Sequence, residues 1–94
     1  MKAVWNGKTI AESNDIIKIE NYCYFPEDSV NKEYLEKTNT HTTCPWKGVA
    51  SYYSVIVDGK ENHDAAWFYA NPSVEAISIK GRIAFWKDVQ IITD

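Results

Sequence analysis

The sequence predicts a mainly β domain, either a small antiparallel sandwich or a partly closed barrel. Short β-compatible runs recur along the whole chain, and two-residue turn sequences such as Asn6-Gly7 and Asp58-Gly59 separate several of them. Four Trp, six Tyr and three Phe in 94 residues supply the dense core that so short a chain needs. The length predicts a single domain, residues 1–94, and we expect seven or eight short strands with one short helix.

The first strands precede a proline. Lys2–Asn6 and Thr9–Glu12 are predicted to form a hairpin, since Asn and Gly tolerate the positive φ of a tight turn. Ile16–Glu20 alternates apolar and polar side chains, as a half-buried strand does. Cys23–Phe25 follows as a further strand, and Pro26 ends it because proline has no N–H for a sheet.

The segment from Pro26 to Lys37 is predicted to hold the main helix, two turns at most, near residues 28–36. Asp28 or Ser29 would cap it. Its weak apolar stripe at helical spacing consists of Val30, Tyr34 and Leu35. The stretch from Thr38 to Thr43 is polar and rich in Thr, and we expect it to be a connection.

The second half of the chain is again β-rich. Val49–Val57 is the strongest predicted strand and is apolar on both faces, which favours burial on both sides. Ala65–Ala70 is the next strand, and Asn71-Pro72-Ser73 is expected to cap a single helical turn. Ile77–Trp86 and Val89–Thr93 form the last predicted pair.

The charge balance, the two cysteines and the lack of long apolar runs argue against several classes of protein. Ten basic against thirteen acidic residues give a net charge of −3, which argues against a general nucleic-acid binder. Cys23 and Cys44 form no CxxC pair, so we predict no metal site and no cofactor. No apolar leader and no run of eighteen apolar residues is present, and we expect a cytoplasmic protein without a membrane partner. The oligomeric state stays open.

One block carries a family resemblance. It runs from Thr43-Cys44-Pro45-Trp46-Lys47-Gly48 into Ala50-Ser51-Tyr52-Tyr53. With Trp5-x-Gly7, Tyr24-Phe25-Pro26 and Ala65-Ala66-Trp67-Phe68-Tyr69, it resembles the family called domain of unknown function 427, along essentially the whole chain.

The resemblance implies a small β-rich single-domain protein with a β-tent-like fold, related to certain zinc-binding proteins and to methionine sulfoxide reductases. Their zinc does not carry over, because this chain lacks CxxC knuckles. Some family labels mention nucleotidyltransferase, but the sequence shows no close pair of metal-binding acids. A shared fold does not establish a function.

Lys47 is the leading candidate for a functional residue. It stands between Trp46 and Gly48 beside a run of aromatic residues. A lysine in an aromatic cleft binds a carboxylate or phosphate as a point charge, or lies over a ring in a cation–π contact. The alternatives are a surface lysine lying along Trp46 and a purely structural pair with Glu20.

The remaining candidates each have a structural alternative. Cys44 is either a reactive thiol, with Lys47 lowering its pKa, or an inert buried cysteine. Glu20 is an acid, a base or a counter-ion for Lys47, or simply an exposed strand carboxylate. The other candidates for ligand binding are Thr43, Tyr53, Trp67 and Tyr69. Aromatic residues in so small a domain are also core filler, and strand alternation sends Tyr52 and Tyr53 to opposite faces.

Three functions follow from these residues. The first is a binding module that accepts a small anionic or planar ligand in an aromatic cleft around Lys47. The second is an enzyme, either of the nucleotidyltransferase kind or one that uses Cys44. The third is a protein-interaction domain with an exposed aromatic patch.

Overall fold

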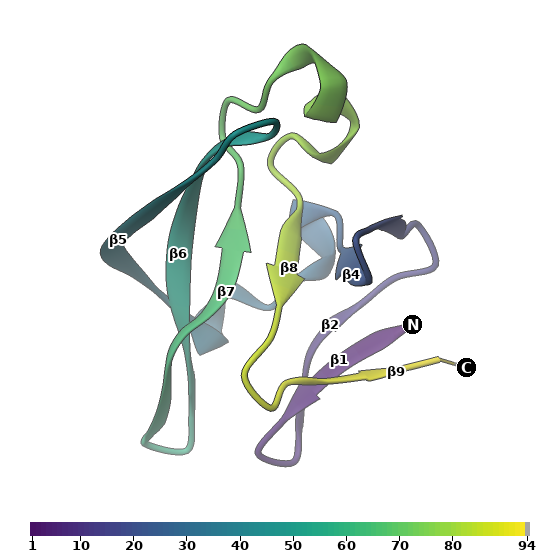
Figure 1. Ribbon diagram of the computed structural model, residues 1–94. Coiled ribbons are helices and arrows are strands. Elements are labelled where there is room, and N and C mark those ends of the chain that lie inside the picture. Colours follow the sequence, from purple (N-terminus) through teal and green to yellow (C-terminus); the bar gives the residue numbers. More distant parts are fainter. Residues whose placement is uncertain (94) are drawn as a thin grey trace.

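The computed structural model describes residues 1–93 and shows a mainly β, antiparallel domain (Figure 1), as predicted. Nine strands are present in this part of the chain, more than the seven or eight expected. They are β1 (Lys2–Trp5), β2 (Lys8–Glu12), β3 (Ile17–Ile19), β4 (Tyr22–Tyr24), β5 (Leu35–Cys44), β6 (Gly48–Val57), β7 (Lys60–Phe68), β8 (Ile83–Phe85) and β9 (Gln90–Ile92).

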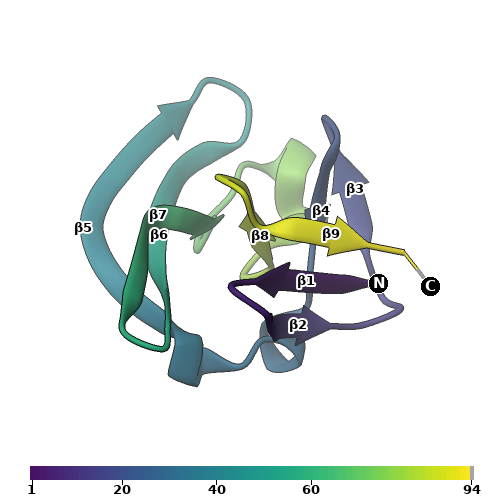
Figure 2. The same ribbon diagram turned by 90° about the horizontal axis from the view of Figure 1, so that it is seen from below.

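The strands form three sheets, ordered β2-β1-β9, β3-β4 and β5-β6-β7-β8. Antiparallel pairing of β1 with β9 brings the two ends of the chain side by side (Figures 1 and 2). The sheets are joined by single bridges, Phe25 to Ile83 and Ala11 to Val30. Figure 2 shows β5 curving away from the β1-β2-β9 sheet, so the barrel is not closed.

Two-residue turns connect several neighbouring strands. Asn6 and Gly7 have φ of 50° and 77°, and Asp58 and Gly59 have φ of 52° and 78°, which confirms both predicted hairpins. A third turn joins β3 to β4 through Glu20-Asn21, with φ of 53° and 70°. This turn contains no glycine, although its backbone favours one.

The short helix predicted near residues 28–36 is not continuous. Two single 3-10 turns, η1 (Glu27–Ser29) and η2 (Lys32–Tyr34), take its place, and Leu35 begins β5 by pairing with Val55. The polar stretch from Thr38 to Thr43 is part of this ten-residue strand and not a connection. β-Branched Thr suits a strand, and pairing along β6 outweighs the weak apolar stripe that favoured a helix.

The predicted strand Ile77–Trp86 is also wrong over most of its length. The 3-10 segment η3 (Val74–Ile79) extends the helical turn expected after Ser73, and only Ile83–Phe85 is a strand. Ala76 and Ile79 face inward from η3 and are buried. Gly81, with φ of +73°, then redirects the chain into β8.

The four-stranded sheet separates two clusters of buried side chains. On β6, Tyr53, Val55 and Val57 face the first cluster, while Ala50 and Tyr52 face the second, as strand alternation requires. The first cluster lies against the β1-β2-β9 sheet. The second consists of Tyr24, Ala50, Trp67, Tyr69, Ala76, Ile79 and Ala84, and the candidate site is built on it.

Candidate functional site

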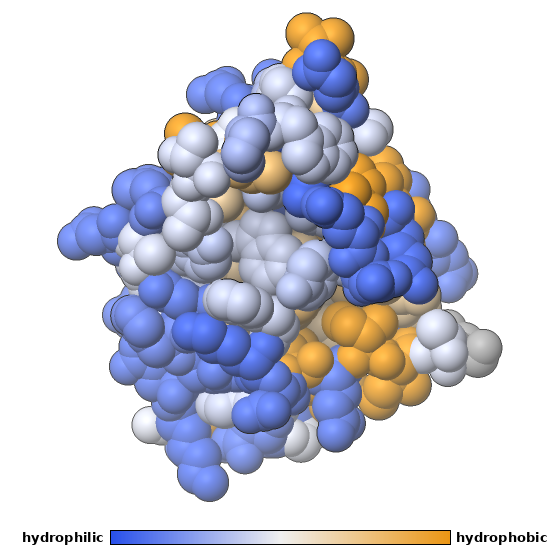
Figure 3. Space-filling model, in the orientation of Figure 1, coloured by the Kyte–Doolittle hydropathy of each residue, from blue (hydrophilic) through white to orange (hydrophobic). Residues whose placement is uncertain are grey.

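An aromatic cleft of about 180 Å³ opens beside the second cluster. It is lined by Tyr22, Tyr24, Lys47, Tyr52, Trp67, Tyr69 and Trp86. Side chains of intermediate hydropathy gather over β7 and β8 in the middle of the face shown in Figure 3, between strongly hydrophilic areas. The lining therefore combines flat aromatic walls with a single cation.

Strand register places Trp67 at the centre of the cleft. Trp67 is paired with Tyr52 on β6 and with Ala84 on β8. Trp67 makes edge-to-face contacts with Tyr22, Tyr24 and Trp86, at centroid separations of 4.8, 6.3 and 5.7 Å. Its indole N–H also donates to the Tyr24 hydroxyl at 3.3 Å.

The turn between β5 and β6 holds Lys47 over this cleft. The backbone N–H of Ser73 donates to the Lys47 carbonyl at 2.8 Å, and the Ser73 hydroxyl donates to the Trp46 carbonyl. Gly48 has φ of +114°, and a Cβ there would lie 3.4 Å from the carbonyl oxygen of Asn71. The loop before η3 thus fixes the turn, and glycine permits both its conformation and its close approach.

The ammonium group of Lys47 is buried and paired. The residue is 6 % exposed, and its Nζ forms an ion pair with the Glu20 carboxylate. The same Nζ lies 5.1 Å from the ring centroid of Trp46 and 5.9 Å from that of Tyr69. Burial lowers the pKa of Lys47, but the hydrogen bond to Glu20 and the nearby Tyr24 and Tyr69 outweigh burial and raise it above its ordinary value. Lys47 is therefore a cation at neutral pH.

Burial keeps two phenols of the cleft, those of Tyr24 and Tyr69, neutral. Burial raises the pKa of Tyr69 to about 12, against the opposing effect of the Lys47 charge. Burial also raises the pKa of Tyr24. The hydrogen bond with Trp67 and the charge of Lys47 lower this pKa, but their effect is smaller than that of burial. Both side chains consequently offer hydroxyl groups, not phenolates, to a ligand.

The structure brings most of the predicted residues together. Lys47, Trp67 and Tyr69 line the cleft. Trp46 and Glu20 are outside the lining but contact the Lys47 ammonium. Cys44 is half-buried and packs against the second cluster.

Two predicted residues lie elsewhere. Thr43 is exposed, and Tyr53 is on the opposite face of β6, stacked on Phe68 at 5.2 Å. Tyr52 takes the place expected for Tyr53. Sequence reasoning also missed Tyr22, Tyr24 and Trp86, although the alternation of Tyr22 and Tyr24 along one strand indicated that they share a face.

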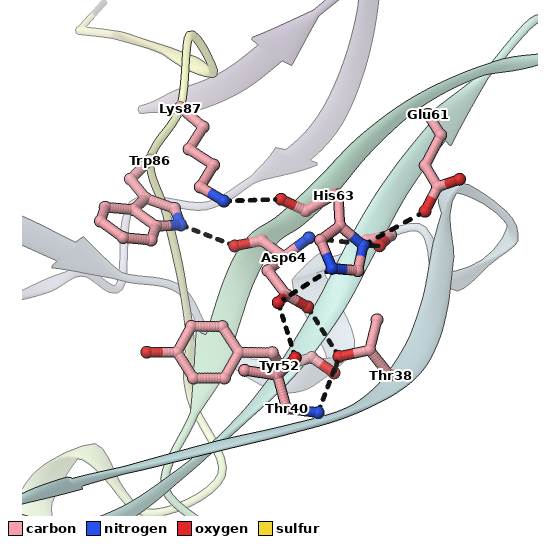
Figure 4. Close-up of polar contacts among 9 residues, drawn as sticks. Thr38, Thr40, Tyr52, Glu61, His63, Asp64, Trp86 and Lys87 are labelled. Carbon is pink, nitrogen blue, oxygen red and sulfur yellow. Dashed lines mark hydrogen bonds and ion pairs between the residues drawn. The ribbon is translucent and has the colours of Figure 1, made fainter.

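A buried carboxylate lies behind one wall of the cleft (Figure 4). Both β5 and β7 carry extra residues here relative to β6, and Asp64 adopts a positive φ of 54° in β7. Its carboxylate accepts hydrogen bonds from the hydroxyls of Thr38 and Thr40, both at 2.7 Å, and pairs with His63 Nε2 at 3.2 Å. Its carbonyl accepts from the Trp86 indole at 2.6 Å. Asp64 and its hydrogen-bond partners thereby orient Trp86.

Two kinds of feature are absent from the described part of the chain. Among residues 1–93, no three or more His, Cys, Asp or Glu side chains are grouped so that they could hold a metal ion. No helix within that range is long and apolar enough to cross a membrane.

The fold and the cleft together define a small antiparallel β domain with one buried lysine in an aromatic cleft. The family model described as domain of unknown function (DUF427) matches residues 1–94, the whole chain. The protein therefore belongs to this family, as the resemblance of its Thr43–Gly48 block indicated. None of the curated proteins matches the sequence.

Proposed function

We propose that the protein is a binding module whose cleft takes a small ligand carrying a negative charge and a planar group. The observation that supports this is the position of Lys47: a buried cation on the wall of an aromatic cleft. A lysine needed only for solubility would lie in solvent. Burying an ammonium group is unfavourable unless it is paired; the half-exposed Glu20 carboxylate is the partner in this structure, and the anionic group of a ligand would suit the same place.

The protonation of Lys47 favours binding over covalent chemistry. A nucleophilic lysine requires a lowered pKa, whereas Glu20 and the surrounding phenols raise the pKa of this one. Its charge is instead suited to holding a carboxylate or phosphate in place. The aromatic rings provide the apolar surface that small-molecule sites commonly have.

Thermal-shift screening against small organic acids and nucleotides tests the proposal. We expect at least one anionic compound to raise the melting temperature of the wild type and to have a much smaller effect on Lys47→Gln. Lys8→Gln is the matched control, because Lys8 is exposed on the distant β2 strand. An absence of stabilisation by any anion, or equal stabilisation of Lys47→Gln, would contradict the proposed function.

Protein interaction is the second candidate, and a set of exposed apolar side chains favours it. Trp46, Val49, Val74 and Ile77 are 40, 51, 86 and 58 % exposed. They belong to the β5–β6 turn with its following strand and to η3, which lie beside each other at the top of Figure 1. Size-exclusion chromatography separates the two functions: Val74→Asp would change the elution of an associating protein and leave ligand binding intact.

The cytoplasmic location remains part of the proposal. Cys23 and Cys44 are both free thiols, which is the usual state of cysteine in a reducing compartment.

A further inference from the structure

We propose that Glu20 is a built-in competitor for the cleft, and that the ligand is an aromatic monocarboxylate whose carboxylate replaces that of Glu20 on Lys47. This inference rests on the proposed function and specifies its ligand class. Four observations carry it: the unequal burial of the pair, the turn that holds Glu20, the lining of the cleft, and its volume.

The two partners of the ion pair differ sharply in exposure. The side chain of Lys47 is 8 % exposed, whereas that of Glu20 is 56 % exposed. A carboxylate that is already half in water loses little on swinging fully into it. The buried ammonium cannot follow, because the Trp46–Gly48 turn is fixed by Ser73. Glu20 is therefore the exchangeable partner, and Lys47 is the fixed part of the site.

The backbone at Glu20 gives no reason of its own for a glutamate. Both turn residues have positive φ, a conformation that Asn and Gly adopt easily and that costs a glutamate energy. In this two-residue turn the first position is occupied by Glu20, a residue type that its positive φ disfavours. What Glu20 contributes is a carboxylate on Lys47. An unfavourable residue retained for a polar contact at a cleft is typical of a functional position.

The lining determines the chemistry of the ligand. Lys47 is the one charged residue among those that line the cleft, and its other lining residues are Tyr or Trp. One cation compensates one negative charge. A dianion such as a phosphate monoester would leave a second charge facing aromatic walls and the nearby Glu20, which disfavours it relative to a carboxylate. Trp67 contacts Tyr22 and Trp86 edge to face, and these three rings form an aromatic wall against which a flat group can pack.

The volume limits the ligand's size. The cleft measures about 180 Å³, below the roughly 300 Å³ at which sites for drug-sized ligands begin. A single fused or isolated ring with one acid group is of suitable size. A nucleotide, with base, sugar and phosphate, exceeds it.

The test is an NMR titration of the full chain with indole-3-carboxylate and benzoate, using backbone amide shifts to obtain Kd. Replacing Glu20 by glutamine removes the competing charge but keeps the shape of the side chain. We expect both probes to bind Glu20→Gln about two- to fivefold more tightly than the wild type, the effect of removing one partly exposed charge partner. In the wild type, the side-chain carboxyl resonance of Glu20 should shift as the probe binds.

Matched probes and variants make the result specific. Glu36→Gln removes a carboxylate from exposed β5 and should leave Kd unchanged. Indole-3-carboxamide, which is neutral, should bind weakly and gain nothing from Glu20→Gln. Cyclohexanecarboxylate, which is not planar, should bind more weakly than benzoate. Glu20 lies in an exposed turn, so its variant is expected to fold, and circular dichroism verifies this.

The outcomes separate the two levels of the proposal. If the carboxylates bind the wild type in a Lys47-dependent manner but Glu20→Gln binds them no more tightly, the competitor role of Glu20 is refuted and the cleft function stands. If neither the wild type nor folded Glu20→Gln binds an aromatic carboxylate while a nucleotide binds through Lys47, the ligand class is refuted. If no anion binds either protein, both proposals are wrong.

Discussion

Replacing Asp64 by asparagine is expected to destabilise the protein at neutral pH and to remove part of its acid sensitivity. The substitution suits the site sterically, because asparagine adopts the positive φ of 54° at least as easily as aspartate. The change therefore tests the charge of Asp64 and not the shape of β7. Asp64 is 8 % exposed, and its carboxylate oxygens accept hydrogen bonds from Thr38 and Thr40.

The magnitude follows from these two hydrogen bonds. A hydrogen bond to a charged group contributes about 1.5–3 kcal/mol and a neutral one about 1 kcal/mol, so the loss over two bonds is about 1–4 kcal/mol. For a domain of this size, each kcal/mol lowers the melting temperature by about 4–8 °C. Asp58→Asn is the matched control, because Asp58 also has positive φ, at 52°, but is exposed. That variant should differ from the wild type by less than about 0.5 kcal/mol.

The pH dependence has a definite sign. Burial raises the pKa of Asp64, but the hydrogen bonds from Thr38 and Thr40 and the charges of His63 and Lys87 outweigh it, and the pKa lies below its ordinary 3.8. Because the pKa of Asp64 is lower in the folded state than in the unfolded state, its carboxylate stabilises the fold at pH values above the unfolded pKa of 3.8. This contribution is lost as the pH falls from 3.8 through the pKa of the folded state.

Urea unfolding, followed by tryptophan fluorescence at about pH 7 and about pH 2.5, measures the difference between wild type and Asp64→Asn. We expect a clear gap at pH 7 that shrinks in acid. A variant as stable as the wild type at pH 7, or a gap that is the same at both pH values, would refute the assigned role of the carboxylate.

Three further changes have expected outcomes. Asn21→Gly should stabilise the β3–β4 turn by about 0.5–1 kcal/mol in thermal unfolding, because glycine suits its φ of 70°; destabilisation would contradict that turn geometry. Tyr69→Phe should remove the ionisation near pH 12 from the ultraviolet absorbance titration, and an unchanged titration at that pH would contradict the burial of this phenol. Gly48→Ala should cost about 1–2 kcal/mol in urea unfolding, since alanine disfavours φ of +114° and meets Asn71; a neutral result would show that the turn shifts readily.

Local sequence predicted the parts of the fold that depend on local chemistry. The Asn6-Gly7 and Asp58-Gly59 hairpins follow from backbone preferences of the turn residues themselves, and both are present. The strand over Val49–Val57 follows from a continuous β-branched and aromatic run, and β6 contains it entirely. These elements need no information about distant residues.

The elements that were mispredicted are determined by distant partners. Leu35 and the Thr-rich stretch become a strand because they pair with β6. The residues close to position 38 in the sequence give no information about that pairing. The predicted strand began at Ile77, yet Ile77 is exposed, and Ile79 faces the second cluster from a 3-10 turn. Tertiary packing overrode the local pattern in both places.

The candidate site could be predicted only in part for the same reason. Lys47, Trp67 and Tyr69 were found because they stand in conspicuous aromatic contexts. Choosing Tyr52 over Tyr53 required knowing which face of β6 meets Trp67, and that depends on the register with β7. Trp86 belongs to the cleft through its contact with Trp67, which only the folded chain reveals.

Two turn residues with unfavourable backbone conformations, Glu20 and Lys87, lie next to the candidate site. Among residues 1–93, positive φ at residues other than Gly, Asn or Asp occurs at Glu20 and Lys87. Each places a charged group on a residue that lines the cleft: Glu20 on the Lys47 ammonium, and Lys87 with its Nζ 5.2 Å from the ring centroid of Trp86. Natural sequences mostly agree with their local structure, and exceptions concentrate where function requires a particular side chain. Both exceptions contact residues that line one cleft, which is where a binding function would place them.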